Sequence, residues 1–548
     1  MSRLAVLSNR VKMPDSGPMA GGLAVALQDV LVGSSVIWMG WNGKVVDNKA
    51  DDTDDFCSYT DNKFDISEDI ALATTGTNGA STTVTYLTTT LTTKQYRHFY
   101  CGFANNVLWP LLHEQADLIS QTPEDYAGYE SVNRLFARQL KKVLHPEDVI
   151  WIHDYHFLSV AYYCRQLGMR NRIGFFLHIP FAPLIFWQQL NQSAELIEHL
   201  AHYDVLGMQT QQNKTNCLAV FRHYLKASIL SDLPIHTYYM LQSLTKDTRS
   251  PSAQLMLNLP SYPTHCLTIN AYPIGINAAR TQQQTMDLSI QSIKPNPKCN
   301  PIKPAAQQII AVDRIDYSKG LSERFSAYRH FLQHYPVYQN QLKLIQIACP
   351  SRLDLPTYQC LYNTVKQTVT DINQQFSPDV CQTTTLPRST FSTDSNASNF
   401  IENWQAITYS EQVLSHETLM RVFWHSDIGW VNSLKDGMNL VAKEYIAAQN
   451  PDDPGVLLLS RYAGAAEQMQ AAIIIDPRQP KSIIQGLKKA LEMPLMQRKE
   501  RYQELLYGLQ QDNLHAWQQD FLDDLYGNKE HQVASARLET RQMPERQE

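Results

Sequence analysis

The chain has 548 residues, of which 43% are hydrophobic and 10% aromatic, enough for two or three globular domains with large cores. Its formal net charge of -6 argues against a nucleic-acid-binding protein. Its 9 cysteines include no Cys-x-x-Cys pair, so neither a disulfide framework nor a zinc site is indicated, and reduced thiols in a cytoplasmic protein are the simplest interpretation.

Two apolar stretches are the candidates for a targeting or membrane segment. The run 1–10 is too short for the apolar core of a signal peptide. The run 173–187 is interrupted by His178, Pro180 and Pro183 and is too short to span a bilayer. We therefore expect no export signal and no membrane partner.

The first predicted unit is a strand, a glycine loop and a helix. Residues 3–8 form an apolar strand, Arg10 follows its C-terminal end, and Gly21-Gly22 opens an apolar helix. This order brings a ligand close to backbone amides. A Gly-Gly pair alone is weak evidence, and the binding interpretation depends on the arginine at the strand end.

The region that follows is less regular. Residues 36–41 are predicted to form a second strand, whereas 44–95 are polar and are predicted to be irregular with short strands. The segment 100–109 carries aromatic residues among small ones, and its spacing favours core packing over a binding site.

Two later strands end in polar residues. The run 149–154 ends in His153-Asp154, and the run 172–178 ends in His178. Ligands of open α/β sheets bind outside the carboxyl ends of the strands, so these ends are candidate site positions. The alternative is that the side chains only cap turns.

Three stretches lack an apolar pattern. Residues 228–267 and 377–400 are predicted to be loops, and the polar, proline-rich run 276–305 is predicted to link two domains.

The second half opens with a strand at 309–314 and a polar turn that ends at Gly320. Arg314 and Lys319 flank this turn, and two cations at a strand end suit a diphosphate leaving group better than a neutral sugar. A further strand at 342–348 is followed by Arg352.

A strand, a turn and a helix organise the C-terminal half. The strand is predicted at 426–431 and the helix at 440–449, with no Gly or Pro inside the helix. The first N–H groups of such a helix point at one spot, which favours a phosphate. Glu444 lies about one turn further on and is placed to accept hydrogen bonds from a ribose. An ordinary αβ helix with an exposed glutamate remains the alternative.

Strands at 456–460 and 472–475 and helices at 482–492 and 512–526 complete the alternation. The pattern predicts an α/β fold with two doubly wound, Rossmann-like domains and a cleft between them. The predicted parts are a first domain at 1–275, a linker at 276–305, a second domain at 306–510, a C-terminal helix at 511–527 that packs back on the first domain, and a disordered tail at 528–548.

Four long motifs in one order carry a resemblance to a known family. They are Trp151 to His156, Ile173 to Phe181, Asp313 to Gly320 and Asp436 to Glu444. With them, and over nearly its whole length, the chain resembles the trehalose-6-phosphate synthases, glycosyltransferase family 20. The resemblance implies a GT-B fold. It also implies a cytoplasmic hexosyltransferase of trehalose biosynthesis, osmoprotection and the stress response, which moves glucose from UDP-glucose to glucose 6-phosphate with retention and gives α,α-trehalose 6-phosphate and UDP.

The resemblance also assigns roles to residues. The acceptor, glucose 6-phosphate, is expected at Arg10, Tyr100, Trp109, Asp154 and Arg352. The donor, UDP-glucose, is expected at Gly21, Gly22, His178, Arg314, Lys319, Leu414, Asp436, Gly437, Met438, Asn439, Leu440, Val441, Ala442, Lys443 and Glu444. Catalysis is expected to involve Asp154, His178, Arg314, Lys319 and Asp436.

The chain departs from the family pattern mainly in its loops. Residues 44–95, 228–267 and 377–400 look expanded, and Lys435 stands where the family often has an arginine. No departure removes a matched ligand residue, although the expansions affect the expected loop positions and acceptor preference.

The expected mechanism needs no covalent nucleophile, because no second carboxylate is placed for that role. A front-face route is expected instead, in which the leaving phosphate oxygen takes the acceptor proton. Since two cations meet the diphosphate, we expect no metal and no other cofactor.

Two other interpretations stay open. One is a family relative that uses another sugar or polyol phosphate as acceptor, or another nucleotide-glucose donor. The other is a non-catalytic sugar-phosphate-binding protein, against which the intact set of charged residues argues. The expected partners are the two small-molecule substrates, with no nucleic acid and no membrane, and a homo-oligomer is compatible with the sequence.

Overall fold

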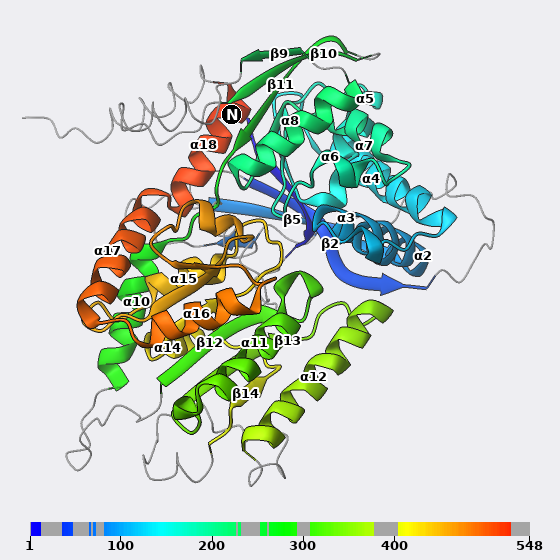
Figure 1. Ribbon diagram of the computed structural model, residues 1–548. Helices are drawn as coiled ribbons and strands as arrows, with labels where there is room; N and C mark the ends of the chain where they lie inside the picture. Colours follow the sequence, from blue (N-terminus) through cyan, green and yellow to red (C-terminus); the bar gives the residue numbers. More distant parts are fainter. Residues whose placement is uncertain are drawn as a thin grey trace, which may run out of the picture. The chain divides into compact units, whose positions relative to one another are not determined.

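The computed structural model describes residues 2–11, 36–47, 65–66, 70–72, 82–225, 228–231, 252–259, 262–292, 307–377 and 404–527. The chain forms two compact units (Figure 1). Unit 1 comprises Met1–Ile274 and His515–Glu548, and unit 2 comprises Gly275–Leu514. Gly21, Gly22, the tail at 528–548 and nearly all of the predicted loop at 377–400 lie outside the described residues.

Unit 1 is built on an 11-stranded sheet of order β3-β5-β2-β1-β6-β7-β8-β11-β10-β9, with β4 pairing β5. The strands from β5 to β11 in this order run parallel, and β3, β4, β10 and β9 pair antiparallel at the two edges. The strand bounds are β1 Leu4–Arg10, β2 Val36–Val46, β3 Asp65–Ile66, β4 Ile70–Leu72, β5 Thr82–Thr92, β6 Val149–His153, β7 Ile173–Phe176, β8 Val205–Met208, β9 Ser228–Ser231, β10 Ala253–Leu259 and β11 Tyr262–Ala271.

The central strands β6 and β7 are buried along their whole length, as expected for parallel strands covered by helices on both faces. The helices of unit 1 are α2 Thr93–Gln95, the wide-turn π-helix η1 Tyr96–Leu108, α3 Trp109–Leu112, η2 Ala116–Leu118, α4 Pro123–Val143, η3 Tyr155–Phe157, α5 Val160–Gln166, α6 Leu184–Trp187, α7 Ser193–Leu200, α8 Gln211–Leu225 and α18 Leu514–Tyr526.

Helix α18 lies near the C-terminal end of the described chain and packs on the centre of the unit 1 sheet. The Phe521 ring stacks on Trp151 of β6 with 4.8 Å between ring centroids. A Cβ on Gly174 of β7 or on Gly207 of β8 would lie 2.8 Å from the Phe521 ring. Glycine on the two neighbouring strands therefore makes room for the aromatic side chains of α18.

Unit 2 has a 6-stranded parallel sheet of order β14-β13-β12-β15-β16-β17. The strand bounds are β12 Gln307–Arg314, β13 Leu342–Cys349, β14 Ile407–Ser410, β15 Ile428–Val431, β16 Val456–Ser460 and β17 Ile473–Ile475. The helices are α10 Ala278–Ser292, η4 Tyr317–Lys319, α11 Leu321–His334, η5 Pro336–Tyr338, α12 Pro356–Phe376, α14 His416–Trp424, α15 Leu440–Ala447, η7 Gly464–Glu467, α16 Pro480–Leu491 and α17 Leu495–Gln511.

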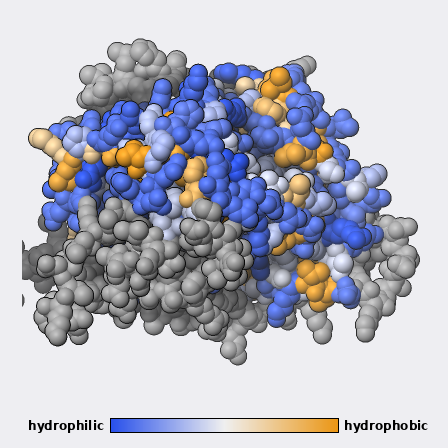
Figure 2. Space-filling model, turned by 60° about the horizontal axis from the view of Figure 1, so that its bottom comes forward, coloured by the Kyte–Doolittle hydropathy of each residue, from blue (hydrophilic) through white to orange (hydrophobic). Residues whose placement is uncertain are grey.

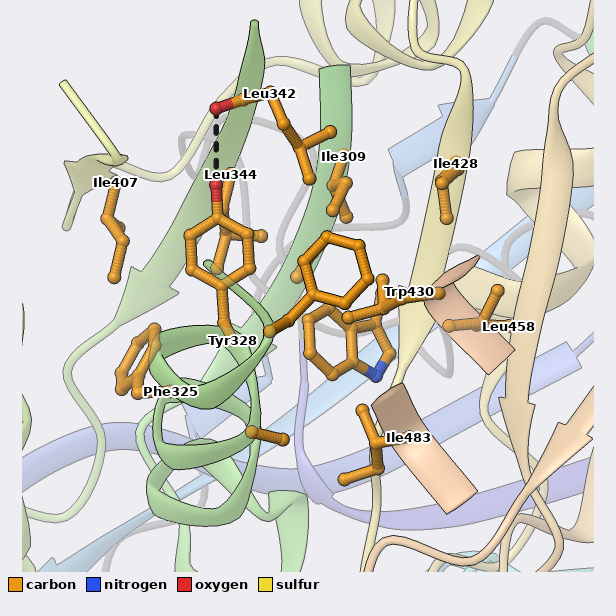
Figure 3. Packing of buried hydrophobic residues seen from close by; sticks show 14 of the residues in the cluster. Ile309, Phe325, Tyr328, Leu342, Leu344, Ile407, Ile428, Trp430, Leu458 and Ile483 are labelled. Carbon is orange, nitrogen blue, oxygen red and sulfur yellow. Dashed lines mark hydrogen bonds between the residues drawn. The ribbon is translucent and has the colours of Figure 1, made fainter. Parts of the chain in front are cut away.

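Helices cover both faces of the unit 2 sheet. On one face, Trp430 of β15 packs among Phe325 of α11 and Ile483 of α16 (Figure 3). On the other face, a Cβ on the preceding residue, Gly429, would meet the ring of Tyr445 in α15 at 2.6 Å. Successive residues of a strand point to opposite faces of the sheet. Helices α11 and α16 therefore cover one face, and α15 covers the other.

The structure differs from the sequence expectation at three places. Residues 228–267 were expected to be a loop, but β10 and β11 form an antiparallel pair there. Alternate residues of these strands are buried, such as Leu255 and Leu257 in β10, and this short period-two pattern was missed beside the prolines. Within 44–95, β5 is a regular strand of 11 residues, whose threonines are β-branched and so suit a strand.

The third difference is in the range 276–305. Helix α10 occupies Ala278–Ser292, and these residues belong to unit 2. Thr281 and Thr285 are buried on this helix, and the Thr285 hydroxyl donates to the Thr281 carbonyl at 2.7 Å. A buried face made partly of threonine gives no apolar periodicity, which is why the sequence pattern indicated a linker.

In the described part of the chain, no helix combines the length and the apolar character needed to cross a membrane. The face shown in Figure 2 is mainly hydrophilic, with hydrophobic residues in small separate groups.

Candidate active site

Lys319 and Asp436, which belong to different sequence motifs, form an ion pair in unit 2. Lys319 ends η4 after strand β12, and Asp436 lies in the turn after β15, the strand next to β12 in the sheet. Lys319 Nζ donates to Asp436 Oδ2 at 2.5 Å, and each side chain is 14% exposed. Ser433 Oγ and Asn439 Nδ2 also donate to Asp436 Oδ2, each at 3.0 Å.

Gly320 allows these two turns to come close together. Its φ of 64° is left-handed, and a Cβ there would lie 2.4 Å from the Asn432 carbonyl oxygen. Asn432 Nδ2 in turn donates to the Gly320 carbonyl at 2.8 Å. The turn that carries Lys319 is therefore tied to the residue that follows β15. Arg314, half-buried, ends β12 on the same edge of the sheet.

Helix α15 begins beside the ion pair. Its N-cap Asn439 has a left-handed φ of 78°, and its side-chain oxygen accepts the N–H of Ala442 at 3.1 Å. Within the described residues, the N–H groups of Leu440 and Val441 have no hydrogen-bond partner. Two amides at a helix start, next to a lysine, form a surrounding that attracts an anion.

Glu444 is half-buried on the same helix, and its carboxyl has no hydrogen-bond partner among the described residues. Burial raises the pKa of this carboxyl to about 7. Burial removes water from this carboxylate, and the described part of the protein supplies no hydrogen-bond donors in its place. A ligand with hydroxyl groups would therefore stabilise the ionised form.

Several other predicted donor residues do not present their side chains to a ligand. Lys443 is fully buried, and its Nζ donates to Gln468 Oε1 at 2.8 Å, while Gln468 donates to Asp512 at 2.7 Å. Burial lowers the pKa of Lys443 to about 8. Gly437, Met438 and Ala442 are buried as well, whereas Leu414 lies half-buried between β14 and α14.

Arg352 lies after β13 in unit 2 and has a positive φ of 51°. Its Nη1 donates to Asp316 Oδ2 at 2.8 Å and to the Tyr358 hydroxyl at 2.7 Å. Asp316 is fully buried, so this contact fixes the guanidinium at the strand end.

In unit 1, Asp154 and His178 come together at the ends of neighbouring strands β6 and β7. Asp154 Oδ1 accepts the backbone N–H of His178 at 3.3 Å. Asp154 has a φ of 76°, a left-handed conformation that is unfavourable for a residue other than glycine and is often found at functional sites. His178 is half-buried, and burial lowers its pKa to about 3.

Trp41 connects two predicted acceptor residues. The exposed Arg10 places its guanidinium over the Trp41 ring, 5.2 Å from the centroid. The Tyr100 ring lies 5.5 Å from Trp41 and stacks on His156, with centroids 5.9 Å apart and planes inclined by 9°. Tyr100 and Arg10 thus share one aromatic cluster around Trp41, which pairs with Arg10 at the end of β1. Sequence reasoning did not name Trp41 or His156 as site residues.

Trp109, in contrast, is a core residue of unit 1. It is only 4% exposed and packs on His113 and Tyr155, with centroid distances of 4.1 and 5.5 Å. This agrees with the interpretation of the segment 100–109 as core packing.

The described residues contain one group of acidic and histidine side chains with ligand-like spacing. Glu130 of α4 and Glu195 and His199 of α7 bring ligand atoms within 4.8 Å of one another. These residues belong to unit 1 and include none of the predicted site residues, so the group has no part in the arrangement around α15.

Two doubly wound parallel sheets, with charged side chains and a helix start at their strand ends, define the GT-B class of glycosyltransferases. The chain belongs to glycosyltransferase family 20, whose family model matches residues 8–400 and 394–527.

Individual relatives cover almost the whole chain. A trehalose-6-phosphate synthase of Sodalis glossinidius (strain morsitans) is 35% identical over 526 residues, which is 96% of each chain. A solved alpha,alpha-trehalose-phosphate synthase (UDP-forming) from Burkholderia xenovorans, in complex with glucose-6-phosphate, has a TM-score of 0.78 and 31% identity and covers 96% of this chain and 100% of its own. A solved structure from E. coli, bound with UDP-2-fluoro glucose, has a TM-score of 0.75 and 31% identity and covers 96% of this chain and 99% of its own.

Proposed function

We propose that this chain transfers glucose from UDP-glucose to glucose 6-phosphate with retention at the anomeric carbon, giving α,α-trehalose 6-phosphate and UDP. The observation that carries the proposal is the Lys319–Asp436 pair beside the start of α15. The substrates follow from the relatives, which are trehalose-phosphate synthases over nearly the same length and include structures with glucose 6-phosphate and with a UDP-glucose analogue.

The donor binds at the start of α15. The amides of Leu440 and Val441 receive the diphosphate, and Arg314 and Lys319 add positive charge. The ribose hydroxyls donate to the Glu444 carboxyl, which has no hydrogen-bond partner among the described residues. The two amides and the Glu444 carboxyl thereby gain hydrogen-bond partners that the described residues do not supply.

The cations also assist the chemical step. As the bond from C1 to the phosphate oxygen breaks, the diphosphate gains negative charge, which Arg314, Lys319 and the helix start stabilise in place. The acceptor hydroxyl then forms the new bond to C1 on the same face, and its proton goes to the leaving phosphate oxygen. UDP and the disaccharide phosphate are the products.

Asp436 is a poor candidate for a covalent nucleophile. One oxygen of its carboxylate accepts hydrogen bonds from Lys319, Ser433 and Asn439, and these donors occupy the lone pairs that an attack on C1 would need. This supports the front-face route, in which Asp436 holds Lys319 in place and contacts the glucose being transferred.

The acceptor binds through Arg10 and Tyr100 for its phosphate and through Asp154 for its hydroxyls. Stacking on Trp41 holds the Arg10 guanidinium in one orientation before any ligand arrives. Arg352 is assigned to the acceptor as well, and its bond to Asp316 holds the guanidinium in place.

The reaction proceeds without a metal or another cofactor, since side chains and amides meet the diphosphate charge. Activity should therefore survive treatment with EDTA. Loss of turnover on chelation, restored by magnesium, would contradict a metal-free reaction. A cytoplasmic location completes the proposal, and the six described cysteines, all of them free thiols, support a reducing compartment.

Release of UDP from UDP-glucose tests the function. We expect release that depends on glucose 6-phosphate. Release that needs another sugar or polyol phosphate, or another nucleotide-glucose, would identify a relative with different substrates. Binding of both ligands without any release would identify a non-catalytic sugar-phosphate-binding protein.

A further inference from the structure

His153 is a buried titratable residue that the proposed reaction does not use. It ends β6, it is fully buried, and its Nδ1 lies 3.0 Å from Nε2 of His178. Its other nitrogen, Nε2, is also buried and has no hydrogen-bond partner among the described residues. His153 therefore has one polar contact, and that contact is to a candidate active-site histidine.

Both imidazoles are neutral at physiological pH. Burial lowers the pKa of His178 to about 3, and burial together with the neighbouring His178 holds the pKa of His153 well below its ordinary value. A neutral imidazole carries one N–H and one lone pair. The 3.0 Å contact must therefore contain one proton, donated by one ring and accepted by the other.

The unpartnered nitrogen of His153 indicates which ring donates. If His178 donated, the proton of His153 would sit on Nε2 as a buried N–H without an acceptor. Nor does an aromatic face accept it, since the rings of Trp151, Phe176 and His178 are inclined to His153 by 44°, 45° and 28° and none is perpendicular. Buried N–H groups without a partner are rarer than buried acceptors without one, so His153 carries its proton on Nδ1.

We propose that His153 is a positioning residue that donates Nδ1–H to His178 Nε2 and so holds His178 as its Nδ1–H tautomer. His178 then offers a fixed N–H donor to a hydroxyl of the glucose being transferred, a consequence that rests on the proposed function. Asp154, the next residue after His153, also helps to position His178, because its Oδ1 accepts the backbone N–H of His178. The end of β6 thus orients both the backbone and the ring of His178.

This arrangement makes His178 a hydrogen-bond donor and not a proton shuttle. Its Nε2 is occupied by His153 and its Nδ1 already carries a proton. The ring therefore leaves the acceptor proton to the departing phosphate oxygen, in agreement with the front-face route.

The tautomer can be measured directly by long-range proton–nitrogen NMR on the full chain labelled with ¹⁵N-histidine, with the His178 signals assigned from a His178→Gln variant. We expect wild-type His178 to show a protonated Nδ1 and an unprotonated Nε2. The opposite pattern would overturn the proposal. Because the spectrum does not depend on turnover, it can be read even if the proposed reaction fails.

Two substitutions separate positioning from packing. His153→Phe keeps an aromatic ring but removes the N–H donor, so His178 should no longer be held as its Nδ1–H tautomer. The kcat should fall by about tenfold to a hundredfold, the range for loss of an orienting partner. His153→Asn keeps an N–H near the place of Nδ1 and should retain the tautomer and most of the activity. His202→Phe, a matched buried histidine bonded to the Glu198 carbonyl, should change neither.

Affinity for UDP provides the structural control, because the groups proposed to bind the diphosphate and the ribose at the start of α15 lie in unit 2. This affinity should be unchanged in all three variants. If His153→Phe keeps the wild-type tautomer and kcat, or if His153→Asn is as impaired as His153→Phe in both readouts, His153 does not position His178.

Discussion

Lys319 Nζ lies 2.5 Å from Asp436 Oδ2, and the two residues come from turns that are 117 positions apart in the sequence but follow adjacent strands. The pair places a cation beside the start of α15 before any ligand is bound. A cation held in this way needs no rearrangement when charge develops on a leaving diphosphate, which is the condition for effective electrostatic catalysis.

The first prediction concerns this charge. Arg314→Ala and Lys319→Ala should each lower kcat by about a hundredfold or more, since loss of one contact to a developing anion costs about 3 kcal/mol. The KM for glucose 6-phosphate should change much less. Steady-state rates at saturating donor measure this, with Lys489→Ala on the exposed face of α16 as a control. Near-normal kcat in both variants would show that the cations do not act on the leaving group.

The second prediction concerns pH and donor binding. The pKa of Glu444 is raised by burial to about 7, and ribose hydroxyls bind the ionised form better than the protonated form. The affinity for UDP should therefore fall as pH is lowered through 7, by at most about tenfold per pH unit. Titration calorimetry should show this in the wild type and not in Glu444→Gln. Equal pH dependence in the two proteins would assign the effect to another group.

Glu444 also carries a stability prediction of opposite sign. Its folded-state pKa lies above the ordinary value of 4.5, so folding disfavours the ionised carboxylate. The destabilisation is absent below the ordinary pKa, grows as pH rises toward 7 and is complete above it. Glu444→Gln should thus raise the Tm of the ligand-free protein at pH above 7 but not in mild acid. A gain of the same size in acid would exclude this cause.

The fourth prediction concerns the acceptor. Arg10→Ala and Arg352→Ala should each lower kcat/KM for glucose 6-phosphate, since one charge-assisted contact is worth about 1.5–3 kcal/mol. Neither should change the lower kcat/KM for glucose, which lacks the phosphate. Comparing both acceptors across the three proteins measures this. If the wild type uses glucose nearly as well as glucose 6-phosphate, the two arginines do not form a phosphate site.

The site residues that follow strands could be predicted from the sequence, whereas those whose role depends on side-chain packing could not. Arg314, Asp154 and His178 stand at the ends of apolar runs, and Lys319 lies in the polar turn after one. Their place beside strand ends can therefore be predicted from the pattern alone. His153 also ends an apolar run, but only the structure shows its ring turned inward onto His178. Lys443 shows the reverse case, because its place in a motif does not reveal that its amine is buried against Gln468.

The fold shows the same division. Continuous apolar runs predicted most of the parallel strands of both sheets, whereas β5, β11 and β14 were not predicted as strands. Helix α10, which has a partly polar buried face, was also missed. Helix α10 buries Thr285, and strand β5 buries Thr88 and Thr89. The hydroxyls of Thr285 and Thr89 donate inside the protein, to the Thr281 carbonyl and to Gln139 Oε1. A hydrophobicity pattern does not detect buried residues of this kind.

The fifth prediction concerns the packing of α18. Phe521 is fully buried against Trp151 and Tyr272, and Phe521→Ala should destabilise unit 1 by about 3–5 kcal/mol. Thermal unfolding should show a lower Tm for this variant, while Tyr507→Ala, at an exposed position of α17, should match the wild type. An unchanged Tm for Phe521→Ala would mean that α18 does not contribute to the core of unit 1.

The central claim is transfer of glucose to glucose 6-phosphate with retention. The most direct measurement is the proton NMR spectrum of the product formed from UDP-glucose and glucose 6-phosphate, recorded together with the UDP released. The account predicts one α,α-linked trehalose 6-phosphate for each UDP, with α-configuration at the transferred anomeric carbon. Release of UDP with free glucose as the only sugar formed, or a β-linkage at that carbon, would contradict it.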